Sequence, residues 1–330
     1  MTNIRLSEDE ARLWRLRSQG LDVGINSQNS AASAQNAVIN QQNGADAVAE
    51  IVRLSAGLQA QDMNTAPLQV RARSLDTKVG DVWKSLSETR HIVRTWAMRG
   101  TLHIVPAEDH KWLTGLLGPS SFSAGRGRRK ELGLDESTLY KAFESFATFF
   151  TQEGPLTRQK LAEMLALEGI RVENQAIHHI VRSGGFLGYI THGPLLDGKT
   201  ETFVLADEWL AGVERPELGR EEALARLAGR YVRAFGPTTD RDFAVWSGLP
   251  LRDARAGWEA ISGELVEVDV EGEPMAALRA ALDSRFRGND EEGVPMGSGF
   301  RRNEGSSGGN DEGVVKLLGF FDTYLLGYRG

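Results

Sequence analysis

Cysteine is absent from this chain of 330 residues, so disulfide bonds and thiolate metal ligands are excluded. Apolar runs of the roughly 18 residues that a transmembrane helix needs are also missing. The first ten residues lack the apolar core of a signal peptide. Hydrophobic residues make up 41% and charged residues 25%, as in soluble globular proteins. We therefore expect a cytoplasmic protein of about two to three domains, with no membrane partner, metal site or cofactor.

Acidic residues outnumber basic ones, 45 against 38, so the net charge is -7. Residues 264–313 alone account for this value, because they hold twelve acidic residues and five arginines. Residues 90–130, in contrast, hold eight basic residues and only two acidic ones, Glu108 and Asp109. Phosphate contacts need a local basic surface, so the negative total does not exclude DNA as a partner.

Two segments have a composition that does not support a packed core. Residues 25–44 are rich in Asn, Gln, Ser and Ala and are predicted to form a flexible insert. Residues 283–313 contain a Gly-rich, charged pattern that is nearly duplicated, which indicates an insertion in a surface loop.

A short helix is predicted at 8–18, before the first of these segments. Between the two segments, one order of elements recurs three times. Apolar spacing predicts helices at 45–58, 63–73 and 79–86, followed by two strands within 90–106 that join at a turn containing Gly100. The second copy has helices at 137–152, after Thr157, and up to Gly184-Gly185, with strands at 186–191 and 201–205. The third copy has helices at 220–233, 236–246 and from Pro250 to 261, with a strand at 264–270.

Helices followed by a hairpin is the order of a winged helix, so we predict a mainly α protein with small β wings (α+β), built from three tandem winged helices. The predicted domains are 1–44 for the leading helix and flexible insert, 45–118, 119–212 and 213–282 for the three winged helices, 283–313 for the duplicated insert, and 314–330 for the start of a C-terminal β segment.

Gln59 and Gln61 flank Ala60 after the first apolar-periodic helix. Neither side chain ionises, and each amide has two donors and an acceptor, so the pair could hold a water in one orientation. The alternative is that they are ordinary polar residues at a helix end. Asp62 follows directly, but successive helical residues point apart, so we do not assign it a role.

Three motifs decide between these alternatives by resemblance. They are Gly-Leu-Gln-Ala-Gln at 57–61, Arg-Thr-Trp-Ala-Met-Arg-Gly-Thr-Leu-His at 94–103 with Val-Pro-Ala-Glu-Asp at 105–109, and Phe-Asp-Thr-Tyr-Leu-Leu-Gly-Tyr-Arg at 321–329. Together they resemble the AlkZ/AlkX winged-helix DNA glycosylases. The resemblance implies tandem winged helices in a concave DNA-binding body, with a small C-terminal β-barrel. Because that family continues past the third motif, we expect the barrel to be truncated here.

The resemblance also implies a catalytic role for Gln59 and Gln61, which match the Gln-apolar-Gln signature of the AlkZ branch; the AlkX branch has Gln-apolar-Asp. An N7-alkylated purine is cationic and leaves without protonation, so a well-placed water can suffice. We therefore expect a monomeric, monofunctional glycosylase that removes alkylated or crosslinked purines from double-stranded DNA. The alternatives are a non-catalytic DNA-binding protein, such as a transcription regulator, and an inactive member of the family.

Seven basic residues are candidates for DNA contact: Arg94, Arg99 and His103 on the first hairpin, and Arg126, Arg128, Arg129 and Lys130 on a predicted mobile loop. The alternatives are a solvated strand face, a structural histidine and a solvated charge run. His178 and His179 are adjacent on a predicted helix, a spacing that does not suit zinc.

Overall fold

The computed structural model describes residues 4–21, 44–74, 76–282 and 322–327. Almost all of the predicted insert at 25–44, and the whole of the duplication at 283–313, lie outside these ranges. The leading helix is confirmed as α1 (Glu8–Ser18), where the Ser7 side chain accepts a hydrogen bond from the Glu10 N–H and Glu10 returns one.

The first helix–hairpin unit is formed by α3 (Gly44–Leu54), β2 (Leu58–Gln59), α4 (Ala66–Arg73), α5 (Val79–Ser87), β3 (Ile92–Trp96) and β4 (Leu102–Pro106). Its antiparallel sheet has the order β2-β4-β3. The predicted turn is confirmed, and Arg99 joins Gly100 in left-handed backbone there, in the short 3₁₀ turn Met98–Gly100. The helix predicted at 45–58 ends earlier, at Leu54, so Gln59 lies on the strand β2 and Gln61 lies in the bend after it.

A connector joins the first unit to the second. It contains a 3₁₀ turn (Ala107–Asp109), α6 (His110–Ala124) and α7 (Arg126–Glu131). The mobile basic loop predicted at Arg126–Lys130 is wrong as a description of structure, because these residues form α7. A short run rich in Arg and Lys suits a helix as well as a loop, since both side chains favour helices.

The second unit is formed by α8 (Glu136–Glu153), β5 (Leu156–Thr157), α9 (Arg158–Leu167), α10 (Ala176–Phe186), β6 (Ile190–His192) and β7 (Thr202–Leu205), followed by α11 (Ala206–Trp209). Its sheet has the order β5-β7-β6. Thr157 caps α9 as predicted, since its side chain accepts the Lys160 N–H at 3.2 Å. Gly185 does not end α10, which continues to Phe186. The missing side chain of Gly185 leaves room for the ring of Trp96.

The third unit is formed by α12 (Arg220–Phe235), α13 (Asp240–Ser247), α14 (Leu251–Ala260), a 3₁₀ turn (Ser262–Glu264), β8 (Leu265–Val270) and β9 (Glu273–Leu278). Pro250 is the residue before α14 rather than its first position. The N-terminal β1 (Ile4–Leu6) pairs in parallel with β8, and Thr238 forms a β-bridge with Ala276 on β9.

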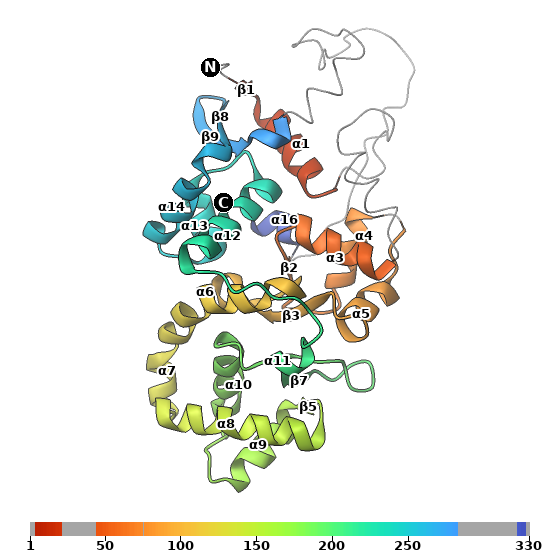
Figure 1. Ribbon diagram of the computed structural model, residues 1–330, viewed down its shortest axis with the longest axis vertical. Helices are drawn as coiled ribbons and strands as arrows, with labels where there is room; N and C mark the ends of the chain where they lie inside the picture. Colours follow the sequence, from red (N-terminus) through yellow and green to blue (C-terminus); the bar gives the residue numbers. More distant parts are fainter. Residues whose placement is uncertain (1–3, 22–43, 75, 283–321, 328–330) are drawn as a thin grey trace.

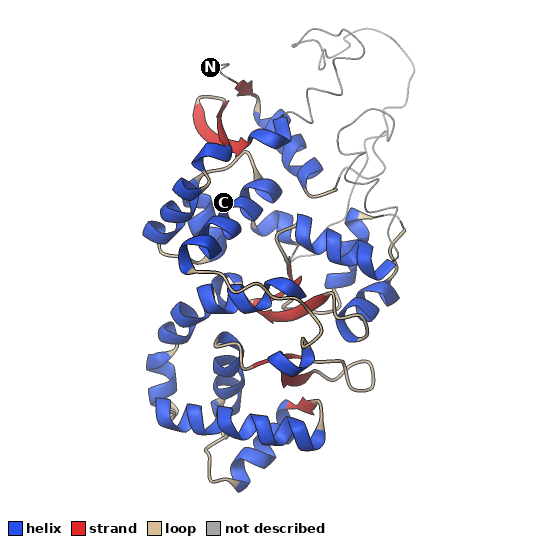
Figure 2. Ribbon diagram, viewed as in Figure 1, coloured by secondary structure: helices blue, strands red, loops and turns tan. Residues whose placement is uncertain are grey.

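All three units share one connectivity. In each, a short extended segment between the first and second helix pairs with the last strand of the hairpin. Figure 1 shows α6 and β3 across the middle of the molecule, with α8 to α10 on one side and the other two units on the opposite side. Helices dominate and the sheets are small (Figure 2), which confirms the predicted mainly α architecture. Within the described ranges, no helix is long and apolar enough to cross a membrane.

The segment 322–327 contains a short helix, α16 (Thr323–Leu326), and so differs from the β segment predicted for 314–330. Asp322 precedes it and accepts the Tyr324 N–H at 2.8 Å. The same carboxylate forms a fully buried ion pair with Arg73 at 2.8 Å, and Arg73 also donates to Gln19 at 2.8 Å. The apolar character of this segment predicted a strand, but the capping bond and this ion pair favour one helical turn.

Candidate active site

Gln59 is the last residue of the short strand β2, and Gln61 lies in the bend that follows it. Gln59 pairs with His103 in the β2–β4 register, and the Ala60 N–H continues the pairing by donating to the Leu102 oxygen at 2.8 Å. Ala60 is fully buried between them, while Gln59 is nearly buried and Gln61 is exposed.

The backbone of Gln59 is hydrogen-bonded on both sides by side chains. Its N–H donates to the Thr323 hydroxyl at 3.1 Å, and its carbonyl accepts from the Gln69 amide at 2.7 Å. Thr323 in turn donates to the Gly57 carbonyl at 3.2 Å. These partners are buried, so the strand that carries the motif is held in one position.

Both amides have an orientation that the chemistry of their partners sets. The Gln59 Oε1 accepts from Arg99 at 3.2 Å, and the Gln61 Oε1 accepts from the Leu102 N–H at 3.2 Å. Both partners can only donate, so the amide oxygen must face them. Each oxygen keeps a second lone pair, and each amide nitrogen keeps its N–H donors, for a bound water.

Arg99 connects the motif to the third unit. It lies at the hairpin turn with φ +56°, and it donates to the Trp246 carbonyl at 2.6 Å. Gly248 packs against its backbone, where an added Cβ would lie 3.0 Å from the Arg99 Cα. Burial lowers the pKa of the guanidinium, but an arginine stays charged in proteins. A positive charge therefore lies beside Gln59.

His103 is buried across the strand from Gln59 and makes a 3.0 Å hydrogen bond from Nδ1 to the Thr101 carbonyl. Burial lowers its pKa to about 4, with a smaller contribution from the nearby Arg99 charge. The ring is therefore neutral at pH 7. Its contact with DNA stays a prediction, and its burial weighs against it.

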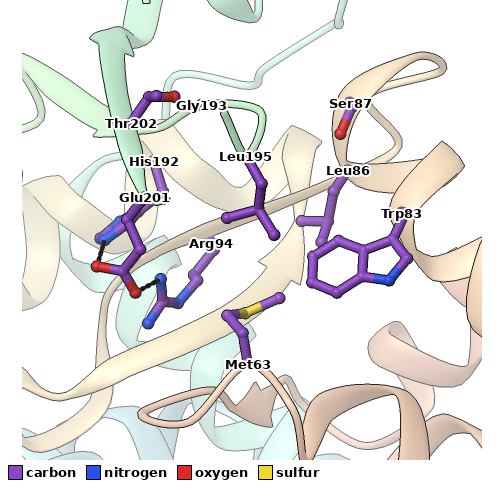
Figure 3. A pocket seen from close by; sticks show the side chains of 10 residues that line it. All are labelled: Met63, Trp83, Leu86, Ser87, Arg94, His192, Gly193, Leu195, Glu201 and Thr202. Carbon is purple, nitrogen blue, oxygen red and sulfur yellow. Dashed lines mark hydrogen bonds and ion pairs between the residues drawn. The ribbon is translucent and has the colours of Figure 1, made fainter. Parts of the chain in front are cut away.

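Arg94 is also buried rather than presented to solvent. It donates to the Ala60 carbonyl at 2.9 Å and forms an ion pair with Glu201 of the second unit at 2.6 Å. Figure 3 shows Glu201 between Arg94 and His192, with the Trp83, Leu86 and Met63 side chains nearby. These internal bonds weigh against the predicted phosphate contact and indicate that Arg94 joins the motif to the second unit.

The basic residues of α7 divide into two groups. Arg126, Arg128 and Lys130 are exposed, and the two arginines pair with acidic side chains at 2.7 and 2.8 Å. Arg129 is buried, donates to the Phe122 carbonyl at 2.7 Å, and lies 4.0 Å above the Phe122 ring. DNA contact stays a prediction for the exposed residues, and burial weighs against it for Arg129.

A cleft of about 180 Å³ opens beside Gln61. The β3–β4 turn forms one wall, and α9 and α10 of the second unit form the other. Residues from this second wall are Arg158, His178 and Arg182, none of which was among the predicted site residues. No cluster of residues that could hold a metal occurs in the part of the chain that the structure describes.

The comparisons with known proteins identify the family of the chain. A family model described as DNA glycosylase AlkZ-like matches residues 52–330. The chain belongs to this family. The AlkZ-like chain is therefore an enzyme of the DNA glycosylase class, the hydrolases that act on N-glycosyl bonds.

A sequence match and a structure match both come from Streptomyces sahachiroi. An interstrand DNA cross-link repair glycosylase is 26% identical over 292 residues, which cover 84% of this AlkZ-like chain and 71% of the relative. The solved structure of the DNA glycosylase AlkZ superposes with a TM-score of 0.68 at 22% identity, and covers 86% and 72% of the two chains. At this identity the structural likeness supports the fold.

The sequence signal for the missed residues of this AlkZ-like site was weak. Thr323 lies in the third motif, but nothing local shows that it reaches a strand 264 residues earlier. Arg158 and Arg182 are single charges on amphipathic helices, where a solvated face is the usual reading. Only the packing of the second unit against the first brings them to Gln61.

Proposed function

We propose that this glycosylase removes cationic N7-alkylated purines, including crosslinked ones, from double-stranded DNA, with a water held by Gln59 and Gln61. The observation that carries the proposal is the fixed orientation of the two amides, which lie two residues apart in the motif. Arg99 and the Leu102 N–H can only donate, so they fix which way each amide oxygen and nitrogen points in the absence of substrate. Such preorganisation is the main contribution that uncharged groups can make to a hydrolysis.

The reaction needs no general acid. The water oxygen forms a bond to the sugar C1′ while the bond from C1′ to the purine N9 breaks. The electron pair of that bond returns to the purine and neutralises its positive charge, and a water proton leaves to solvent. The nearby ionisable groups are consistent with a reaction that uses no general acid: His103 is neutral, and Glu201 is already paired with Arg94. Uncharged bases, which leave poorly without protonation, are expected to be released slowly.

Support for bulky and crosslinked lesions comes from two sources. The relative from Streptomyces sahachiroi carries interstrand cross-link repair in its name. Gln61 is exposed rather than at the bottom of a closed pocket, so a damaged base that reaches it need not be fully enclosed. We further propose that the three units act as winged helices along one duplex, and that a single copy of the chain suffices.

The test is base release from a duplex with one 7-methylguanine, under single-turnover conditions and with alkali to cleave abasic sites. Gln59→Ala and Gln61→Ala are each expected to lower the rate roughly 10²-fold, because the water loses its orientation. Gln152→Ala on α8, an exposed glutamine outside the site, is the matched control and should keep the wild-type rate.

A uracil duplex is tested in parallel and should yield little product. Release of uracil faster than 7-methylguanine contradicts the proposal. Wild-type binding without release, equal in the two Ala variants, indicates a non-catalytic DNA-binding role instead.

A further inference from the structure

The wall of the cleft opposite Gln61 is built from basic residues of the second unit. Arg158 is the first residue of α9, and His178 and Arg182 lie one turn apart on α10. Residues four apart share a helix face, so His178 and Arg182 face the cleft together. The facing wall is formed by Gln61 and residues 100–102.

The positive charge of this wall is only partly balanced. Among the described residues that line the cleft, Glu201 is the single carboxylate. It binds Arg94 at 2.6 Å, whereas Arg158 stays 3.8 Å away. Arg182 donates to the Gly100 carbonyl at 3.2 Å, which uses one of the five N–H donors of its guanidinium. The two arginines therefore offer donors and net positive charge to the cleft.

The histidines on α10 respond to this excess charge. Burial lowers the pKa of His178 below its ordinary 6.5, and the Arg158 and Arg182 charges lower it further. Burial also lowers the pKa of His179, with contributions from Arg182 and two arginines of α7. A positive potential that disfavours a further cation favours an anion at the same place.

We propose that Arg158 and Arg182 bind one backbone phosphate next to the damaged nucleotide, and so hold the sugar of that nucleotide against Gln61. The inference rests on the proposed function. Guanidinium groups match the planar donor geometry that phosphate oxygens accept. A cleft of about 180 Å³ is smaller than the roughly 300–1,000 Å³ of sites for drug-sized ligands, so it suits one phosphate rather than a bulky adduct.

Rigid packing behind the cleft supports this role. Gly185 on α10 lies against the Trp96 ring, where an added Cβ would be 2.1 Å from a ring atom. Trp96 also stacks on Phe203, with ring planes 9° apart. Trp96 belongs to β3 of the first unit, so the helix that carries Arg182 is fixed against the sheet that carries Gln59. The distance from phosphate to glutamine is thereby set by the fold.

The experiment measures the salt dependence of binding to a duplex with one tetrahydrofuran abasic site, between about 50 and 200 mM KCl. Affinity falls as salt rises, and each phosphate that the protein neutralises contributes about 0.9 to the magnitude of the slope of log affinity against log salt. The Arg158→Gln/Arg182→Gln double variant is expected to reduce the magnitude of this slope by about 1. Arg12→Gln on α1, which pairs with Glu8 and Asp9 outside the cleft, is the control and should leave the slope unchanged.

Lysine replacements separate charge from folding damage. Arg158→Lys/Arg182→Lys removes the same guanidinium groups but keeps both charges, so its slope should stay close to that of the wild type. An unchanged slope in the Gln double variant, or an equal loss in the Lys double variant, overturns the inference.

Base release by the wild type is measured alongside. If it releases 7-methylguanine while the Gln double variant keeps its slope, only the phosphate site is refuted. If the slope falls but the wild type releases no 7-methylguanine, the proposed substrate is refuted and the phosphate site stands.

Discussion

Thr323 is the residue that joins the end of the described chain to the motif strand. Its hydroxyl accepts the Gln59 N–H and donates to the Gly57 carbonyl, so one side chain bridges two backbone groups two residues apart. The hydroxyl is buried, so losing it would leave both backbone groups without this partner. Both hydrogen bonds of the hydroxyl go to the backbone of the motif segment, so Thr323 positions Gln59.

Replacing Thr323 with Val is therefore expected to lower kcat about 10-fold with little change in KM, because orientation rather than binding is lost. Stability should also fall by about 1–3 kcal/mol, since a buried donor is left unsatisfied. Single-turnover and steady-state rates on 7-methylguanine DNA measure the first effect, and urea unfolding measures the second.

Thr323→Ser restores the hydroxyl and should restore kcat. A Val variant that loses stability but keeps the wild-type kcat would show that Thr323 is only structural.

At the scale of elements, the crossing of α6 and α10 has no room for a side chain. A Cβ added to Gly118 on α6 would lie 1.8 Å from the carbonyl oxygen of Phe186 at the end of α10. Gly115, one turn earlier on α6, is exposed, and a Cβ added there would have no heavy atom within 4 Å. The two glycines therefore form a matched pair in one helix.

Gly118→Ala is expected to cost roughly 1–3 kcal/mol of unfolding free energy, because the crowded backbone must move. Gly115→Ala should instead stabilise by about 0.5–1 kcal/mol, since alanine favours a helix where nothing is crowded. Urea unfolding of both variants provides the comparison. Equal effects of the two substitutions would mean that the helices do not cross at Gly118.

The elements that the sequence predicts well are those with a local signal. Periodic apolar spacing and the Thr157 cap located most helices, and β-branched residues on both sides of Met98-Arg99-Gly100 located the first hairpin. The two-residue strand β2 carries no such signal, because its extended form comes from pairing with β4. Gln59 and Gln61 could be selected from the motif, but their amide orientation depends on Arg99 and the Leu102 N–H, which no spacing rule provides.

At the scale of the whole molecule, buried neutral histidines link stability to pH. Burial lowers the pKa of His103 and of His110 to about 4 each, and it lowers the pKa of His192 well below the ordinary value. Between pH 6.5 and 4 the unfolded chain therefore binds more protons than the folded one. The free energy of unfolding therefore falls as pH falls through this window.

Urea unfolding between pH 7 and 5 should show the loss, with about 2 kcal/mol from each of His103 and His110 at pH 5. His110→Gln is expected to remove its share of the slope. His91→Gln is the control, because His91 is half exposed. A free energy of unfolding that stays constant from pH 7 to 5 would contradict these pKa directions.

The buried contact between Arg73, Gln19 and Asp322 has a consequence for the newly made protein. Translation produces residue 19 first, then 73, and residue 322 only after the three helix–hairpin units. Until Asp322 arrives, the buried Arg73 lacks its counter-charge and Gln59 lacks the neighbouring Thr323. A nascent chain can thus form its helices while the strand that carries Gln59 is still loose. On the proposed function, base release would therefore begin only once this late segment has docked.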